Sequence, residues 1–381
     1  MSKLDDLINE FCPNGVEYQP LKNKELFSFH YGIGNKIPKD TSGKYDVYGA
    51  NGIVSHIDKY NCEDVTIIGH IGAVGLINRC KGKCFVTYNG TIAEVVDKSK
   101  ICSQYLYYIL CTLNLPSYKK GSQPFLSISD IEHLQIPLPP LPVQKEIVRI
   151  LDKFTELTTE LTTELTLRKK QYEYYRDFLL SEEQLGEEVN YLPLGSLIKR
   201  EREKGKHCPN ITQVYAISNT LGVVRSEDFH EGTTYSEKTD NYTILRRGMF
   251  AYNPSRLNIG SIGLLKDDIE GLVSPMYVVF SVDKKVNCAY LEQFLKSSYA
   301  KNKINSLKEE GARFRFDFKR WNYIQIPLPP LKVQERVVKI LDKFDSLVND
   351  LSKGLPAEIE ARKKQYEYYR DKLLSFKKIE E

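Results

Sequence analysis

Two long stretches of the chain place hydrophobic residues at helical spacing. Between Ile147 and Leu179 the apolar and aromatic positions are separated by alternating steps of four and three residues, which is the repeat of a coiled coil. This spacing predicts one helix from about Val143 to Ser181, roughly 58 Å long at ~1.5 Å per residue. A helix of that length with a single apolar stripe is unstable alone in water, so it needs a partner helix.

The second stretch, from Val337 to Leu373, supplies that partner. It has the same spacing apart from two successive steps of four residues between Leu351 and Ile359, and Pro356 marks a point where the helix kinks or breaks. We expect the helices to pair through Leu151, Phe154, Leu157, Leu161, Leu165, Tyr172 and Tyr175 on the first and Leu341, Phe344, Leu351, Tyr366 and Tyr369 on the second.

Short apolar runs outside these stretches are typical of strands. The pattern predicts strands at 65–69, 85–88, 244–245 and 278–282, and short helices at 105–110 and 290–295. The segments before the two long helices are therefore expected to have a mainly β core, with helices near their ends.

Both long helices belong to an internal repeat. The segment Ile136 to Phe154 recurs 190 residues later with 14 of 19 positions identical, and Arg168 to Leu180 recurs 194 residues later with 12 of 13 identical. Both copies of the first segment, at Ile136 and at Ile326, open with Ile-Pro-Leu-Pro-Pro-Leu. This hexapeptide cannot lie inside a helix, because proline lacks an amide donor. The segments before the blocks share only their opening residues and differ elsewhere.

These observations predict an α+β protein in four parts. Residues 1–135 and 189–325 form two mainly-β domains, and residues 136–188 and 326–381 form the helices that follow them. We expect the helices to build an antiparallel coiled coil with pseudo-twofold symmetry.

Composition narrows the function only slightly. Charged residues make up 27% and hydrophobic residues 41%, with a net charge of +4, which is compatible with nucleic acid but not diagnostic. No apolar run is long enough for a membrane span, and the N-terminus lacks the apolar region of a signal peptide, so we expect a cytoplasmic protein. Eight cysteines and six histidines show no metal-ligand spacing, so we expect free thiols and no metal.

Basic and amide side chains suited to DNA occur in two corresponding loops, each about fifteen residues before the proline motif. Cations bind phosphates, and Arg, Lys, Asn and Gln hydrogen-bond to base edges. The candidates in and near these loops are Lys119, Lys120, Ser122 and Gln123 in the first half, and Arg313, Arg315, Lys319 and Arg320 in the second. Further candidates in the second half are Arg246, Arg247, Asn253, Arg256 and Asn258.

Motifs of a catalytic subunit are missing. The closest approach to an amino-methyltransferase motif is Asn253-Pro254-Ser255-Arg256, which lacks the second proline and the aromatic residue that stacks on a flipped base. Neither a G-x-G-x-x-G nor a G-x-x-x-x-G-K-[ST] sequence is present. We therefore expect no cofactor and no catalysis by the chain itself.

The ensemble of duplicated proline motif, coiled-coil helix and Arg-Lys-Lys-Gln-Tyr-Glu-Tyr-Tyr-Arg-Asp resembles the specificity subunits of Type I restriction–modification enzymes over essentially the whole chain. The resemblance implies that each variable segment is a target-recognition domain for one half of a bipartite site in double-stranded DNA. It also implies that the helices set the spacer between the half-sites and dock two modification (methyltransferase) subunits, with restriction (motor-nuclease) subunits completing the complex.

The first helix contains three tandem Thr-Glu-Leu-Thr units from Thr155 to Thr166, and the resemblance implies that their number sets the spacer. One unit adds ~6 Å of helix without inverting its buried face. Two alternatives remain open: the recognition subunit of a Type IIB-like system, and a coiled-coil scaffold that assembles proteins.

Overall fold

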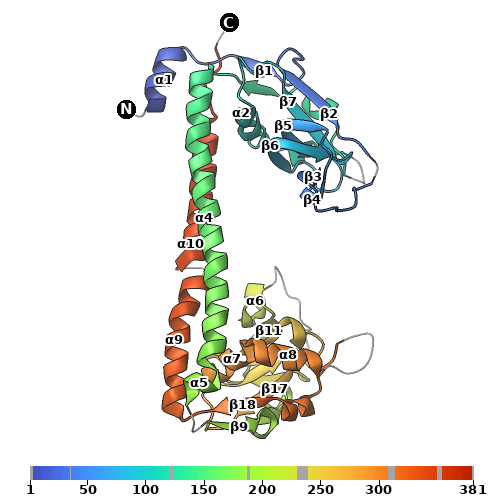
Figure 1. Ribbon diagram of the computed structural model, residues 1–381. Coiled ribbons are helices and arrows are strands. Elements are labelled where there is room, and N and C mark those ends of the chain that lie inside the picture. Colours follow the sequence, from blue (N-terminus) through green and yellow to red (C-terminus); the bar gives the residue numbers. More distant parts are fainter. Residues whose placement is uncertain are drawn as a thin grey trace. The chain divides into compact units, whose positions relative to one another are not determined.

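The computed structural model describes residues 3–34, 36–120, 124–186, 189–229, 239–307, 314–349 and 354–379 (Figure 1). The chain divides into two compact units. Unit 1 takes residues up to Thr162 and from Glu358 onward, and unit 2 takes Thr163 to Ala357. Each unit thus combines one variable segment with part of both long helices. The predicted domain boundaries after residues 135, 188 and 325 come from the sequence repeat. The two units are instead defined by which residues pack together in space, so their boundaries differ.

The core of unit 1 is a six-stranded sheet in the order β2-β7-β5-β6-β3-β4. Its strands are β2 (Phe27–Tyr31), β3 (Tyr45–Gly49), β4 (Gly52–Ile57), β5 (Cys62–Gly69), β6 (Ile77–Val86) and β7 (Gly90–Val95). The helical elements of unit 1 besides the long helices are α1 (Lys3–Phe11), α2 (Ser103–Leu110), the 3-10 turn η1 (Leu115–Tyr118) and α3 (Ile128–Ile131). Residues 65–69 of strand β5 are all buried, as expected for a central strand.

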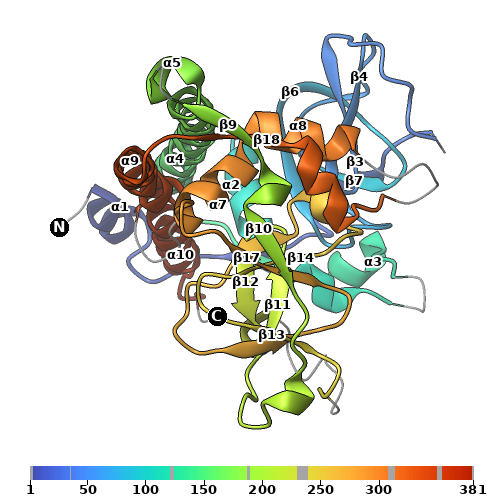
Figure 2. The ribbon, with the colours of Figure 1, turned by 90° about the horizontal axis from the view of Figure 1, so that it is seen from below.

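Unit 2 repeats this arrangement as two four-stranded sheets, β10-β17-β14-β15 and β12-β11-β16-β13 (Figure 2). The strands are β10 (Ile198–Glu201), β11 (Val214–Ser218), β12 (Gly222–Arg225), β13 (Thr243–Leu245), β14 (Phe250–Tyr252), β15 (Ile262–Leu264), β16 (Gly271–Val273) and β17 (Val278–Val282). The helical elements are α5 (Glu182–Leu185), α6 (Ser226–Phe229), α7 (Cys288–Lys296), α8 (Ser298–Ser306), and the 3-10 turns η2 (Leu194–Ser196), η3 (Gly205–His207), η4 (Leu257–Ile259) and η5 (Phe318–Tyr323).

The two units share their topology although their sequences differ. In unit 1, β3 and β4 form an antiparallel hairpin and β3 runs parallel to β6; in unit 2, β11 and β12 form the hairpin and β11 runs parallel to β16. The order β2-β7-β5-β6 likewise corresponds to β10-β17-β14-β15. Strands β5 and β14 are therefore equivalent, and we refer to them as the central strands.

Most of the predicted short elements are confirmed. The runs at 65–69, 244–245 and 278–282 lie in β5, β13 and β17, and the short helices lie in α2 and α7. The strand predicted at 85–88 was wrong for Thr87 and Tyr88, because β6 ends at Val86. The amide and hydroxyl of Thr87, directly after β6, both donate to the carbonyl of Tyr48 in β3.

The proline motifs form short strands that close each variable segment. In unit 1, β8 (Gln135–Pro137) pairs with β1 (Tyr18–Pro20), and in unit 2, β18 (Gln325–Leu328) pairs with β9 (Asn190–Pro193). The Tyr105 hydroxyl donates to the carbonyl of Pro137 over 2.9 Å, and the Tyr290 hydroxyl donates to that of Pro327 over the same distance. In each unit the proline motif that leads into the long helix is thus attached to its own variable segment by the same contact.

A buried glutamine repeats this attachment at the start of each helix. Gln144 accepts from the amide of Cys102 over 3.0 Å and donates to the carbonyls of Lys100 and Pro139 over 2.8 and 2.7 Å. Gln334, also fully buried, makes the matching bonds to Asn287, Lys285 and Pro329 over 2.8, 3.0 and 2.8 Å. The side-chain oxygen of each glutamine thus accepts one hydrogen bond and its nitrogen donates two, as expected of a buried amide.

The long helices pair within each unit as the apolar spacing predicts. They are α4 (Leu141–Leu179), α9 (Leu331–Asn349) and α10 (Gly354–Leu373). The second stretch is thus described as two helices, and α10 begins at Gly354, which has a φ of +78° and lies close to Pro356, where a kink or break was predicted. In unit 1, Phe154 of α4 stacks on Tyr369 of the antiparallel α10 with ring centroids 5.4 Å apart; in unit 2, Tyr175 of α4 stacks on Phe344 of α9 at the same distance (Figure 1).

Most of the other residues predicted to pair the helices are buried or partly buried. Leu151 and Leu341 are fully buried and Tyr172 is 5% exposed, and the partly buried group comprises Leu161, Leu165 and Tyr366. Leu157 is 46% exposed, which corrects its assignment to the pairing, since the stripe passes through Thr158 instead. Leu351 lies outside the described residues. No described helix is long and apolar enough to cross a membrane.

Candidate nucleic-acid interface

In each unit the loop before the proline motif is bonded to the loop that follows the central strand. The amide of Leu126 donates to the carbonyl of His70 over 3.1 Å in unit 1, and the amide of Phe316 donates to that of Pro254 over 3.0 Å in unit 2. Leu126 and Phe316 are both buried and, like the proline motifs, lie 190 residues apart. The two loops predicted to bind DNA therefore occupy equivalent places. We call this pair of loops in each unit its loop surface.

The loop surface of unit 2 is cationic and amide-bearing. Arg256 and Asn258 are exposed in the loop after β14, and Arg315 is exposed beside the buried Phe316. Asn253 lies first in this loop and is 6% exposed, and its side-chain oxygen accepts from the amide of Ser255 over 3.0 Å. The structure thus brings together four of the predicted residues, three facing solvent and Asn253 shaping the turn. Arg313 lies outside the described residues.

Arg246 and Arg247 do not belong to this surface. They precede β14, at the opposite end of the strand from Asn253. The Arg246 guanidinium pairs with Glu203 at 2.7 Å and Glu270 at 3.3 Å, and Arg247 pairs with Asp268. The Glu203 carboxylate raises the pKa of Arg246, and Arg246 in turn lowers that of Glu203. Because their charges are balanced within the protein, we leave both arginines out of the loop surface.

Lys319 and Arg320 lie on η5, close behind the loop. The Asp317 side chain accepts from the amide of Lys319 over 2.9 Å and so caps this turn, leaving the Lys319 ammonium exposed. The Arg320 guanidinium donates to the carbonyl of Leu307, the last described residue before the gap ahead of Phe314. Arg320 therefore positions the chain, while Lys319 remains a candidate contact.

The loop surface of unit 1 has fewer charges. Lys119 is exposed, while the Lys120 ammonium pairs with Asp130, which forms the capping box of α3 with Ser127. The Lys120 ion pair and hydrogen bonds from Ser127 lower the pKa of Asp130 to about 2. Lys120 and Phe125 exchange both backbone hydrogen bonds, which closes the loop between them. Ser122 and Gln123 lie outside the described residues.

An aromatic cluster replaces the arginines in unit 1. His70, fully buried directly after β5, has ring centroids 4.6 Å from Tyr31, 5.4 Å from Tyr88 and 5.5 Å from Phe125. Its Nδ1 lies 3.0 Å from the Thr91 hydroxyl, and burial lowers the pKa of the imidazole to about 4. The ring is therefore neutral at physiological pH, and Tyr88, 40% exposed, carries the cluster to the surface.

Comparison with known proteins decides the family. The model described as the Type I restriction modification DNA specificity domain matches residues 15–168 and 208–361. The chain belongs to this family. It carries one such domain in each half, and it is the DNA-specificity component of a type I restriction–modification system rather than an enzyme in its own right.

Relatives of this specificity subunit are similar along most of their length. A putative type I restriction enzyme specificity subunit of Haemophilus influenzae is 31% identical over 379 residues, covering 95% of this chain and 96% of that protein. The EcoR124I/EcoR124II specificity subunit of Escherichia coli is 35% identical over 306 residues, covering 74% and 73%. The crystal structure of the type I S subunit from M. genitalium has a TM-score of 0.55 at 16% identity over 94% of this chain and 96% of that one, which shows a shared fold.

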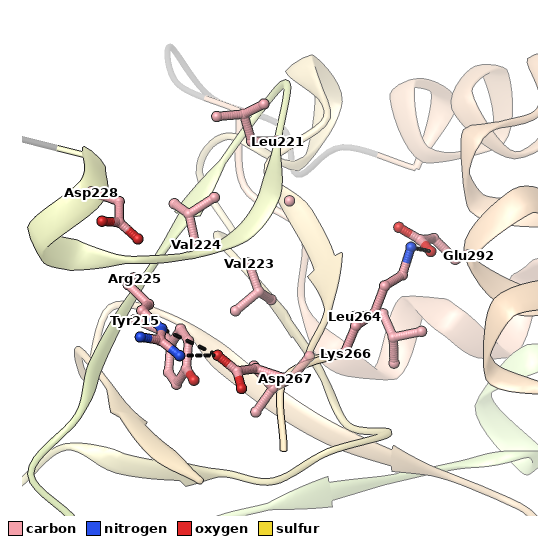
Figure 3. Close-up of a pocket in the computed structure, with 12 residues that line it drawn as sticks. Tyr215, Leu221, Val223, Val224, Arg225, Asp228, Leu264, Lys266, Asp267 and Glu292 are labelled. Atoms are coloured by element: carbon pink, nitrogen blue, oxygen red, sulfur yellow. Dashed lines mark hydrogen bonds and ion pairs between the residues drawn. The ribbon is translucent and has the colours of Figure 1, made fainter. Parts of the chain in front are cut away.

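A pocket of about 330 Å³ lies beside the β11–β12 hairpin of the specificity subunit (Figure 3). Two of its walls carry ion pairs, Arg225 with Asp267 at 2.7 Å and Lys266 with Glu292 at 2.8 Å. These charges are balanced by each other rather than presented to a ligand. Among the described residues, no group of three or more His, Cys, Asp or Glu side chains could hold a metal ion.

Proposed function

We propose that each unit of this specificity subunit reads one half of a bipartite DNA site through its loop surface. The observation that carries the proposal is the recurrence of one backbone frame, with the Leu126–His70 and Phe316–Pro254 bonds, holding different exposed side chains. Exposed Arg256, Asn258 and Arg315 offer donors for guanine or adenine edges and for phosphates, and Lys119 offers a phosphate contact. Equivalent frames with different side chains suit two half-sites of different sequence.

The helices are proposed to set the spacer between the half-sites. Helix α4 runs through all three Thr-Glu-Leu-Thr units without a break, so removing one unit shortens it by ~6 Å, just under two base-pair steps of ~3.4 Å. The threonine hydroxyls bond within the helix, Thr159 to the carbonyl of Thr155 over 2.8 Å and Thr162 to that of Thr158 over 2.7 Å. These two bonds lie within α4, and helix length is the variable that we propose a repeat changes.

Two modification subunits are proposed to dock on the repeated decapeptide of the helices, and restriction subunits to join that complex. The decapeptide leaves an equivalent tyrosine exposed in each unit, Tyr368 in unit 1 at 62% and Tyr174 in unit 2 at 65%. Exposed aromatic residues at duplicated positions fit one partner surface per unit, because aromatic side chains are enriched in protein interfaces. Native mass measurement of the co-expressed complex tests the ratio: two modification chains per specificity subunit are expected, and Tyr174→Ala should reduce the ratio to one.

The decisive experiment maps methylated adenines in cells that carry this chain and an active modification partner. Variants with two or four tetrapeptide units should keep both half-sites and change the spacer between them. A matched control replaces Thr159 and Thr162 by alanine at constant length and should leave the spacer unchanged. A bipartite motif whose spacer ignores the repeat number would refute the ruler but not the reader. No methylation dependent on this chain would favour a protein-assembly scaffold.

A further inference from the structure

Each unit has a hairpin whose tip lies against the loop surface without belonging to it. These hairpins are β3–β4 in unit 1 and β11–β12 in unit 2. A Cβ atom on Gly69 would lie 2.7 Å from the carbonyl oxygen of Ala50 at the first tip. In unit 2 a Cβ on Gly260 would lie 3.1 Å from the carbonyl oxygen of Asn219. A Cβ does not fit at Gly69, and the φ of +91° at Gly260 favours glycine, so the hairpin tip lies against the end of the central strand in unit 1 and against the loop that follows it in unit 2. The frame therefore has three elements: hairpin tip, loop after the central strand, and loop before the proline motif.

The tip in unit 2 is held in a defined conformation. The buried Ser218 hydroxyl accepts from the amides of Thr220 and Leu221, each over 3.2 Å. The Ser261 hydroxyl donates to the carbonyl of Ile217 over 3.2 Å and ties the hairpin to the loop that carries Arg256 and Asn258. These bonds fix the backbone on both sides of the tip, so its exposed side chains are presented from a rigid support.

Each tip exposes an asparagine followed by an aliphatic side chain. Asn51 and Asn219 are exposed, and two residues later Ile53 is 50% and Leu221 is 61% exposed. A carboxamide can donate to and accept from one adenine edge in the major groove, and an aliphatic group can contact the thymine methyl. Both tips thus carry an exposed asparagine and, two residues later, an exposed aliphatic residue. The two turns differ in length, so a shared turn geometry does not account for this recurrence.

We propose that the hairpin-tip asparagine of each unit, Asn51 in unit 1 and Asn219 in unit 2, determines specificity by reading a base edge of an A·T pair. The inference rests on the proposed function, and it adds the hairpin tip as a third reading element. Asn219 acts beside Arg256 and Asn258, so it extends the cationic loop surface of unit 2 by a neutral, base-directed contact. In unit 1, Asn51 extends a surface whose described residues include Lys119 and the Tyr88 cluster.

The test is the methylation map of the complex with Asn219→Ala, with Asn51→Ala and with the control Asn210→Ala. Asn210 is an exposed asparagine before the other end of β11. Asn219→Ala should relax one position of one half-site, the half-site that Arg256→Ala also affects, by roughly tenfold or more in preference for the A·T pair. Asn51→Ala should relax one position of the other half-site, and Asn210→Ala should change neither.

The outcomes separate the inference from the proposed function. If the wild-type complex yields no bipartite motif with an active partner, the proposed function fails. If the motif is present and both tip variants leave every position as selective as in wild type, only the hairpin inference is overturned. Asn219→Asp keeps the shape but removes the amide donor, so it should reproduce the relaxation; if it methylates the wild-type motif unchanged, the inference is also overturned. A variant that melts like wild type but weakens all sites equally would make the asparagine a phosphate contact and would equally overturn it.

Discussion

The loop surfaces of the two units share a backbone and differ in chemistry. In unit 2 the first loop residue after the central strand is Asn253, and Arg256, Asn258 and Arg315 face solvent around it. In unit 1 the strand register places Gly69 at the position of Asn253, and the next residue, His70, anchors an aromatic cluster. The frame is kept by buried groups that recur, while the exposed positions carry no packing constraint. A protein built this way can change what it reads without changing how it folds.

The largest expected effect tests whether the frame is truly equivalent in the two units. Gln144→Ala and Gln334→Ala each leave three backbone groups without their partner, so each should lower the free energy of unfolding by about 3 kcal/mol or more. Denaturant titration with hydrogen exchange at α2 and α7 measures this loss and locates it. The exposed Gln184→Ala is the control and should be neutral. Losses that differ by more than about 1 kcal/mol between the two variants would break the equivalence.

The second effect sharpens the difference within unit 2. Arg256→Ala removes an exposed cation from the loop surface, so the complex should bind its DNA site roughly 10- to 100-fold more weakly, with a salt dependence reduced by about one charge. Arg247→Ala is the matched control, because the charge of Arg247 is already balanced by Asp268. Fluorescence anisotropy against salt concentration measures both. Equal losses for the two arginines would show that the loop surface is wrongly placed.

The third effect should appear in unit 1 alone. The folded state keeps His70 neutral down to about pH 4, whereas the unfolded state protonates it near pH 6.5, so stability is complete above that value and falls as the pH drops toward 4. At pH 5.5 the loss is on the order of 1 kcal/mol relative to pH 7.5. His70→Asn, whose side chain does not titrate in this range, should remove this contribution to the pH dependence. An NMR titration that gives His70 an ordinary pKa would contradict the burial on which this rests.

The smallest effect compares the two lysines of unit 1. Lys119→Ala should weaken DNA binding a few-fold and reduce the salt dependence by about one charge, because its ammonium is exposed and makes no ion pair among the described residues. Lys120→Ala should do less, since that ammonium is paired with Asp130. Removing Lys120 should also let the pKa of Asp130 rise from about 2. The same anisotropy assay decides; a larger loss for Lys120 would make it the DNA contact.

Much of the fold was predictable because its signals are periodic or duplicated. The spacing from Ile147 to Leu179 predicted α4 within two residues at each end, and Pro356 predicted a kink or break near the residue where α10 begins. The candidate site was predictable only in part. Arg256 and Arg315, predicted from residue type, are exposed on the loop surface, but Arg246 and Arg247 have the same residue type and are balanced by acids distant in sequence. The hairpin tips were missed, although Asn51-Gly52 is itself a strong hairpin-turn signal.

By itself the sequence determined the duplicated architecture, the long helices and the family, because apolar spacing and near-identical repeats are properties of the chain read in order. Only the tertiary structure decided which residues share a surface. Whether an arginine is free or paired depends on strands brought together from distant positions, as Arg246 and Glu203 are. The equivalence of the two variable domains was likewise decided in three dimensions, because strand order and buried backbone bonds persist where the exposed side chains differ.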